Sequence, residues 1–255
     1  MKTIQTKIDL KRKKKVINLL NHISSLDETV INIFGNRHDP YFVKIYNSFE
    51  LALSKKIKLC TEIRSMDGLS GRKFRVLLNN LIRTFEHPKY LEIGSWLGST
   101  ACSACYKNDL EMTCIDNWSQ NFSNNLDPKK TFKKNIKNYI TKNSKFRIIE
   151  KDFRQFNFNL LEKINIYFYD GSHNYEDHFD SVKLILPSLA NKFIFIVDDW
   201  NWRQVREGTL DAIKKQKLRV VSGLEIKTTD DDSSSLVTGS NSDWHQGVAF
   251  FVIEK

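Results

Sequence analysis

Four side chains suited to proton transfer or metal binding follow two apolar segments of the chain. Asp170 and His173 come after the first segment, and Asp198 and Asp199 come after the second. If both segments are parallel strands of one sheet, their carboxyl ends meet at one edge, where such sheets bind ligands. Carboxylates at close range raise each other's pKa unless a cation neutralises them, and an all-oxygen set suits Mg²⁺. The sequence therefore predicts metal ligands at Asp170, Asp198 and Asp199; alternatively, one or two of them only cap a helix or order a turn.

His173 lies three residues after Asp170, and the ordinary pKa of histidine is close to neutral pH. Beside a metal-bound hydroxyl it is a candidate general base, so we predict His173 and Asp170 as catalytic residues. The alternative is a turn histidine whose ring nitrogens are satisfied by hydrogen bonds.

A glycine turn follows an earlier apolar segment. Gly94 and Gly98 frame this turn, and glycine permits positive φ and a close approach of the backbone to a ligand. Trp96 occupies the place of the middle glycine in the dinucleotide fingerprint, so a carboxylate fits there better than a pyrophosphate. Asp116 lies 22 residues beyond Gly94, where a strand-end acid accepts ribose hydroxyls. Together they favour a nucleoside-binding site over a plain strand–helix turn. For Asp152, a helix cap and a contact to an adenine edge stay equally open.

Short apolar runs alternate with helical patterns from residue 89 onward. This alternation predicts a parallel sheet with helices on both faces. The link 223–246 is polar and lacks a helical pattern, so the seventh strand is predicted to be antiparallel, and the link itself to be disordered or a lid. Residues 1–65 are predicted to form a mainly helical extension, and 66–255 the main domain. The predicted strands are 90–93, 112–115, 146–149, 164–169, 193–197, 218–221 and 248–253. The predicted helices lie near 99–108, 129–142, 154–162, 174–190 and 203–216.

The segments LEIGSWLGST, CIDNW, YDGSH and VDDW resemble class I S-adenosylmethionine-dependent methyltransferases. They look closest to the metal-dependent O-methyltransferases, which include the catechol, caffeoyl-CoA and macrolide-sugar enzymes. The resemblance implies an α/β, Rossmann-like, seven-stranded sheet whose last strand is antiparallel, and metal ligands at the three aspartates named above. His173 stands where the catechol and caffeoyl-CoA enzymes carry a lysine. The cofactor-binding residues that we predict are Glu92, Gly94, Ser95, Gly98, Thr100, Asp116, Asn117 and Asp152.

These residues predict methyl transfer from S-adenosylmethionine to a hydroxyl of a small molecule or sugar, assisted by Mg²⁺ or a similar divalent cation. A vicinal diol would chelate such a metal well. Three alternatives stay open: an NAD-type oxidoreductase, a catalytically inactive binding module with the methyltransferase fold, and methylation of nitrogen.

The formal net charge of +10 is concentrated in two blocks. Residues 1–20 carry +6 and residues 129–147 carry +8, so the remaining chain carries −4. Neither block overlaps a predicted cofactor motif, so no nucleic-acid partner is expected. Without an apolar stretch behind the basic N-terminus or a long apolar run, we expect a cytoplasmic protein with no membrane span. A homo-oligomer is compatible with this sequence. Cys102 and Cys105 are predicted to be buried small side chains.

Overall fold

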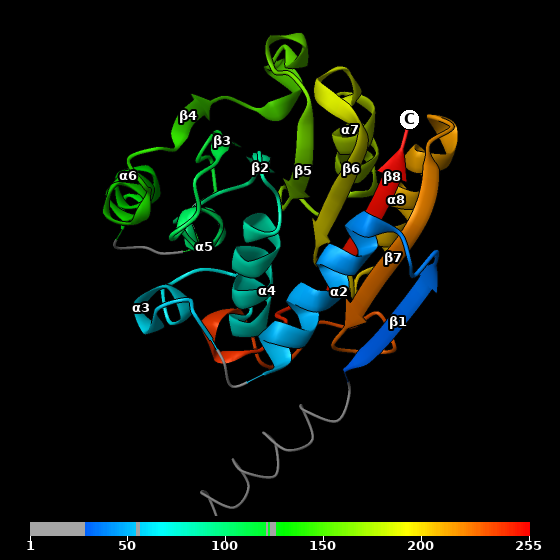
Figure 1. The fold of residues 1–255 in the computed structure, drawn as a ribbon, viewed down its shortest axis with the longest axis horizontal. Coiled ribbons are helices and arrows are strands. Elements are labelled where there is room, and N and C mark those ends of the chain that lie inside the picture. The colour runs from blue at the N-terminus through cyan, green and yellow to red at the C-terminus, as the bar shows by residue number, and fades with distance from the viewer. Residues whose placement is uncertain (1–28, 55–56, 121, 123–125) are drawn as a thin grey trace, which may run out of the picture.

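Eight strands form one sheet in the computed structural model (Figure 1), which describes residues 29–54, 57–120, 122 and 126–255. The strand order is β1-β7-β8-β6-β5-β2-β3-β4. Strands β2 to β6 run parallel to their neighbours within that set, and β8 is antiparallel to both β6 and β7. The strands are β1 Val30–Gly35, β2 Lys89–Ile93, β3 Glu111–Asp116, β4 Lys145–Glu150, β5 Ile164–Tyr169, β6 Leu189–Asp198, β7 Arg219–Lys227 and β8 Val248–Glu254.

The prediction of seven strands is wrong by one. All seven predicted strands are present, and the last is antiparallel as expected. The additional strand, β1, lies within the segment predicted to be a helical extension, and it pairs antiparallel with β7 from Val30 opposite Lys227 to Gly35 opposite Ser222. A six-residue strand at the sheet edge is stabilised by its partner, and here the partner lies almost two hundred residues away. Residues 1–28 of the predicted extension lie outside the described part of the chain.

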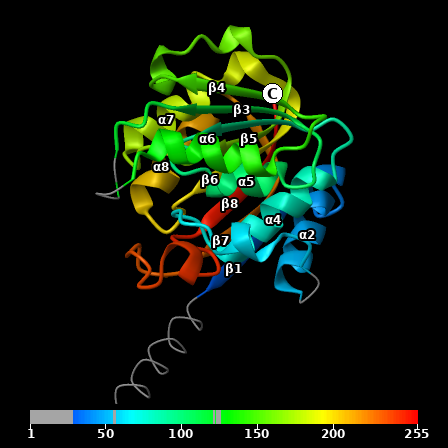
Figure 2. The same cartoon turned by 90° about the vertical axis from the view of Figure 1, so that its left-hand side faces the viewer.

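Helices cover both faces of the sheet (Figures 1 and 2). One face carries α2 Pro40–Leu53, α3 Thr61–Arg64, α4 Arg72–Arg83, α5 Ser99–Cys105 and α6 Pro128–Tyr139. The other carries α7 Tyr175–Lys183 and α8 Arg203–Lys215. Cys102 and Cys105 are fully buried in the first layer, as predicted. Among the described residues, no helix has both the length and the apolar character that a membrane crossing needs.

Two predicted helices differ from those observed. The segment 154–162 forms two short 3₁₀ turns, Phe153–Gln155 and Phe158–Leu160, instead of one helix. Asp152 and Asn157 each accept a backbone hydrogen bond at the start of a turn, which favours short local structure over a continuous helix. The helix predicted over 174–190 ends earlier, at Lys183.

Residues 223–246 are tied to the rest of the fold rather than detached from it. Strand β7 extends to Lys227, and the loop beyond it hydrogen-bonds to Asn201, whose side chain contacts Thr228. The backbone N–H groups of Lys73 and Phe74, at the start of α4, donate to the carbonyl of Asp243 at 3.0 and 3.2 Å. The start of α4 thereby holds this loop against the carboxyl edge of the sheet.

Asp39 joins helix α2 to the sheet. Its Oδ1 accepts the backbone N–H of Tyr41 at 2.9 Å, capping the helix, and its Oδ2 contacts the ammonium of Lys192 on β6. Burial alone raises the pKa of Asp39, but the hydrogen bonds from Lys192 and the Tyr41 backbone outweigh it and lower the pKa.

We predict that Asp39→Ala lowers the free energy of unfolding by about 1–2 kcal/mol at pH 7, because it removes a helix cap. Asp39→Asn keeps a capping oxygen and removes the charge beside Lys192, so it serves as the control. Because the folded pKa is lowered, the charge stabilises the fold above the unfolded pKa and loses this effect as the pH falls through the folded pKa. In urea unfolding, the difference between wild type and Asp39→Asn should therefore shrink towards pH 3. A constant difference would contradict the ion-pair contribution.

Candidate active site

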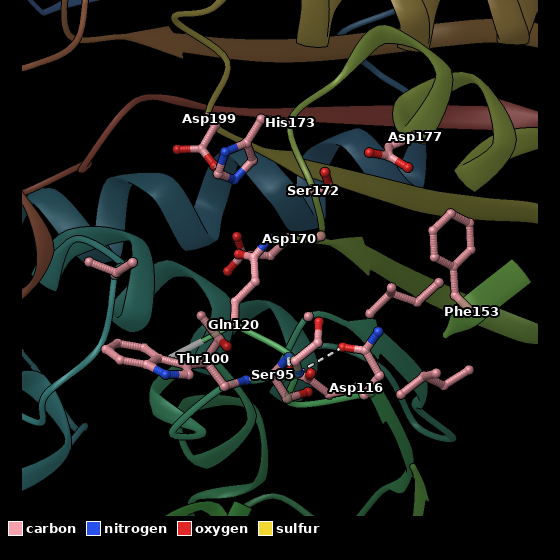
Figure 3. A pocket seen from close by; sticks show the side chains of 18 of the residues that line it. Ser95, Thr100, Asp116, Gln120, Phe153, Asp170, Ser172, His173, Asp177 and Asp199 are labelled. Atoms are coloured by element: carbon pink, nitrogen blue, oxygen red, sulfur yellow. Dashed lines mark hydrogen bonds and ion pairs between the residues drawn. The ribbon is translucent and has the colours of Figure 1, made fainter. Parts of the chain in front are cut away.

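A cavity of about 490 Å³ opens at the carboxyl ends of strands β2 to β6 (Figure 3). Its walls come from the turn after β2, the loops after β3, β4, β5 and β6, and two segments remote in sequence, around Leu69 and His245. Of the predicted cofactor residues, five contribute side chains to these walls and Gly94 contributes backbone. The five are Ser95, Thr100, Asp116, Asn117 and Asp152.

The two glycines of the turn after β2 have different neighbours. Both have φ of +86°, in the left-handed region that favours glycine. A Cβ on Gly94 would lie 1.8 Å from the backbone oxygen of Asp170, so the loops after β2 and β5 touch there. A Cβ on Gly98 would lie 2.8 Å from the ring of Phe132 on α6. Gly94 thus lines the cavity, whereas Gly98 is required by packing behind it.

Asp116 holds this turn in shape. Its Oδ2 accepts the backbone N–H groups of Ser95 at 2.8 Å and Trp96 at 2.7 Å, and its Oδ1 accepts that of Trp118 at 2.7 Å (Figure 3). Each carboxylate oxygen has two lone pairs, so Oδ1 keeps acceptor capacity for a ligand hydroxyl. The predicted ribose acceptor is therefore also the residue that organises the glycine turn.

Glu92 lies behind the cavity and does not line it. Its side chain is fully buried, and the hydroxyl of Tyr90 donates to its Oε2 at 2.5 Å. Burial raises the pKa of Glu92 to about 7, although hydrogen bonds from Tyr90, Ser95 and Thr100 act in the opposite direction. Among the predicted cofactor residues, Glu92 can therefore act only through the turn that it supports.

Asp152 caps the 3₁₀ turn after β4, accepting the backbone N–H of Arg154 at 2.9 Å, and it also lines the cavity. The next residue, Phe153, contributes an apolar wall that the sequence reasoning missed. The guanidinium of Arg154 lies 4.8 Å from the centre of the Phe153 ring and pairs with Asp177 on α7. The available sequence signal for this wall was an aromatic residue, Phe153, directly after the acid that follows β4.

On the opposite side of the cavity, Asp170, His173 and Asp199 lie close together (Figure 3). One ligand-type atom from each lies within 4.8 Å of the others, and His173 Nε2 is 2.7 Å from Asp199 Oδ2. Burial lowers the pKa of His173, but the hydrogen bond and charge of Asp199 outweigh it, and the pKa is raised. Burial, followed by the charges of Asp198 and Asp199, raises the pKa of Asp170 well above its ordinary value. The cluster therefore combines a histidine whose pKa is raised with the carboxyl group of Asp170, whose pKa is also raised.

Asp198 is the predicted ligand that this group does not include. Its carboxyl is buried, and its Oδ1 accepts the backbone N–H of Asp199 at 3.0 Å. Burial and then the charge of Asp199 raise the pKa of Asp198 well above its ordinary value. The structure thus groups His173 with Asp170 and Asp199, and it places Asp198 beside this group as a buried carboxyl neighbour.

His245 reaches the same cluster from the loop before β8. Its Nδ1 accepts the backbone N–H of Gly239 at 3.0 Å, which leaves the ring proton on Nε2, 3.9 Å from Asp199 Oδ1. No sequence pattern predicted a role for His245. His245 and Gln246 line the cavity, while Trp244 is buried against Phe49.

Four tryptophans follow strand ends, namely Trp96, Trp118, Trp200 and Trp202, and two of them line the cavity. Trp96 and Trp202 line the cavity. Trp200 is buried in the core and donates from Nε1 to Glu225, and Trp118 donates to the carbonyl of Trp96 and packs on α6. A position at a strand end does not by itself show whether a tryptophan lines the cavity or packs in the core.

Comparison with known proteins adds an independent finding. Residues 91–200, which run from the glycine turn to the Asp198–Asp199 pair, match the model of a methyltransferase domain. The match supports the predicted methyltransferase class. No curated protein matches the sequence.

Solved structures similar to this chain include TrmN from Thermus thermophilus, at 12% identity and a TM-score of 0.45, over 71% of this chain and 48% of that one. This chain therefore spans about half the length of TrmN. The Podospora anserina methyltransferase PaMTH1, bound to S-adenosylhomocysteine, has 14% identity and a TM-score of 0.46, over 94% and 96% of the two chains. An O-methyltransferase from Bacillus cereus, also bound to S-adenosylhomocysteine, has 10% identity and a TM-score of 0.48, over 85% and 91%.

We predict that Asp116→Asn lowers the free energy of unfolding of the ligand-free protein by about 1–3 kcal/mol. An amide offers one acceptor oxygen where the carboxylate serves three backbone N–H groups. Ser119→Ala, at a nearby exposed position, is the matched control and should change the value by less than about 0.5 kcal/mol. Equal losses in urea unfolding for the two variants would show that Asp116 does not organise the turn.

Proposed function

We propose that the protein transfers the methyl group of S-adenosylmethionine to a hydroxyl oxygen of a small polar acceptor. One observation carries the proposal: the glycine turn with Asp116 and the cluster of Asp170, His173 and Asp199 face one continuous cavity. The glycine turn with Asp116 suits a nucleoside, and the cluster offers a base and anionic groups. A hydroxyl must lose a proton when it is methylated, so both halves are needed.

The cofactor would be held mainly by groups that already have fixed positions. Asp116 Oδ1 is proposed to accept ribose hydroxyls, and Asp152 and Phe153 to flank the adenine. Ser95 and Thr100, which line the cavity beside Gly94, would contact the methionine portion. When bound, the cofactor supplies a methyl group on a sulfonium. Much of the remaining rate enhancement would come from aligning acceptor and methyl group.

His173 is proposed as the base. Because Asp199 accepts the Nε2 proton, the lone pair of the neutral ring lies on Nδ1, which takes the acceptor proton. The acceptor oxygen then forms a bond to the methyl carbon as the carbon–sulfur bond breaks, which leaves S-adenosylhomocysteine. The protonated His173 is stabilised by Asp199, and its side chain is 37% exposed, so the proton can pass to solvent.

A divalent cation, predicted as Mg²⁺, is proposed to assist at Asp170, Asp198 and Asp199. These carboxyl groups are crowded in an enclosed site, and the pKa values of Asp170 and Asp198 are raised. A cation would stabilise their ionised forms. A cation there would lower the pKa of the acceptor hydroxyl. Mn²⁺ accepts the same oxygen ligands as Mg²⁺ and can replace it as a paramagnetic probe.

Calorimetric titration with S-adenosylhomocysteine and, separately, with NAD tests the cofactor. We expect S-adenosylhomocysteine to bind with micromolar affinity and NAD to bind at least a hundredfold more weakly, because Trp96 occupies the place where a dinucleotide turn needs glycine. Tighter binding of NAD would support the oxidoreductase alternative. Absence of binding by S-adenosylhomocysteine would refute the proposed function.

Titration of Mn²⁺ followed by electron paramagnetic resonance tests the metal. We expect one bound ion per chain in the wild type, and a loss of affinity of at least tenfold in Asp170→Asn and in Asp199→Asn. Asp177→Asn is the matched control, because Asp177 lines the same cavity but pairs with Arg154. Unchanged Mn²⁺ binding in both cluster variants, or no bound ion in the wild type, would refute metal assistance and leave His173 and Asp199 to act alone.

A further inference from the structure

We infer that the acceptor is a neutral oligosaccharide or glycoconjugate, and that a polar groove beside His173 binds the sugar unit next to the one that is methylated. The inference rests on the proposed function, because it takes the cavity around His173 as the place of methyl transfer. It goes beyond that function by assigning a second subsite and a substrate class.

The groove is a hollow of about 450 Å³ that continues from the main cavity towards solvent. The two share the side chains of Gln120, Ser172, His173 and Trp202. The groove adds Asn174, Gln204 and Asp232. Its size lies within the range of sites that bind small organic molecules. A ligand with one hydroxyl at His173 therefore has a direct path into a second binding space.

The amide groups in the groove are available to a ligand. No hydrogen bond to another described residue uses the side chain of Gln120 or Gln204, and Asn174 uses only its Nδ2, towards Ser172 and Asp177. An amide offers both donors and an acceptor, and a sugar hydroxyl is itself both donor and acceptor. Unused amides of this kind match a ligand with several hydroxyl groups.

Trp202 stands between the proposed base and the groove. Its Nε1 donates to Ser234 at 3.3 Å, and its ring centroid lies 4.7 Å from that of His173 at an interplanar angle of 63°. These two contacts fix a large apolar ring with one polar edge at the junction of the two spaces. Such a ring can pack on the C–H groups of one sugar unit while the amides bind its hydroxyls.

The charge of the groove excludes other acceptors. Among the described residues that line it there is no lysine or arginine, and its one carboxylate, Asp232, pairs with Arg206. Binding of phosphate backbones depends on cationic contacts, which this lining lacks. An apolar acceptor would cover the amides without satisfying their hydrogen bonds, which is unfavourable. A neutral polyhydroxyl ligand avoids both penalties.

The test is binding of the full chain, saturated with S-adenosylhomocysteine, to a printed array of neutral mono-, di- and trisaccharides. An RNA oligonucleotide and catechol are measured in parallel. We expect at least one di- or trisaccharide to bind at least tenfold more tightly than its component monosaccharide. Trp202→Ala should weaken that binding at least tenfold and Gln204→Ala at least threefold, whereas Trp202→Phe should retain part of it. Gln216→Ala, at the other end of α8, is the matched control and should bind like the wild type.

Three results would overturn the inference: no saccharide bound, no preference for two or more units, or binding unaffected by Trp202→Ala and Gln204→Ala. Tighter binding of RNA or catechol would overturn it as well. The affinity for S-adenosylhomocysteine is measured on every variant to distinguish failure of this inference from failure of the proposed function. Intact cofactor binding without saccharide binding would refute only the saccharide groove. Gln204 is exposed, so its variant keeps the test valid if Trp202→Ala fails to fold.

Discussion

The backbone contact between Gly94 and Asp170 fixes the relation between the two halves of the site. No side chain fits between the two loops there, because a Cβ on Gly94 would lie 1.8 Å from the Asp170 oxygen. Strands β2 and β5 are parallel neighbours, so their carboxyl ends are forced into this proximity. Asp116 braces the turn from the side of β3, and Asp199 holds His173 from the side of β6. The glycine turn and the cluster of Asp170, His173 and Asp199 therefore lie on opposite sides of one packed junction.

The local charge of the cavity differs from that of the whole chain. The chain carries a formal charge of +10, yet the acids that line the cavity outnumber its lysine and arginine side chains. Arg154 is largely neutralised by Asp177 and Asp180, which leaves the acids around Asp170 and Asp116 facing the cavity. An acidic cavity suits a cationic sulfonium and a divalent ion, because both lower the repulsion between carboxylates. Net charge thus says little about the chemistry of this protein.

Two segments far apart in sequence complete the cavity, and helix α4 joins them. Arg75 is fully buried, and its guanidinium donates to the carbonyls of Ile63, Met66 and Gly68 and to the Ser70 hydroxyl. These bonds shape the loop that brings Leu69 to the cavity. The start of the same helix holds the carbonyl of Asp243, close to His245. Burial lowers the pKa of Arg75 to about 10, and the guanidinium stays charged at neutral pH because backbone carbonyls replace its water.

The sequence by itself determined the seven main strands, the antiparallel last strand, the glycine turn, and the acids that follow the strands. These features are local, since apolar alternation, a glycine at positive φ and a strand-end carboxylate each need only neighbouring residues. Tertiary structure decided β1, the packing role of Gly98, the retreat of Glu92 behind the cavity, and the pairing of His173 with Asp199. It also placed Trp202 at the groove and Trp200 in the core. Each of these depends on contacts between residues distant in the chain, and no local pattern encodes which distant side chain will fill a given space.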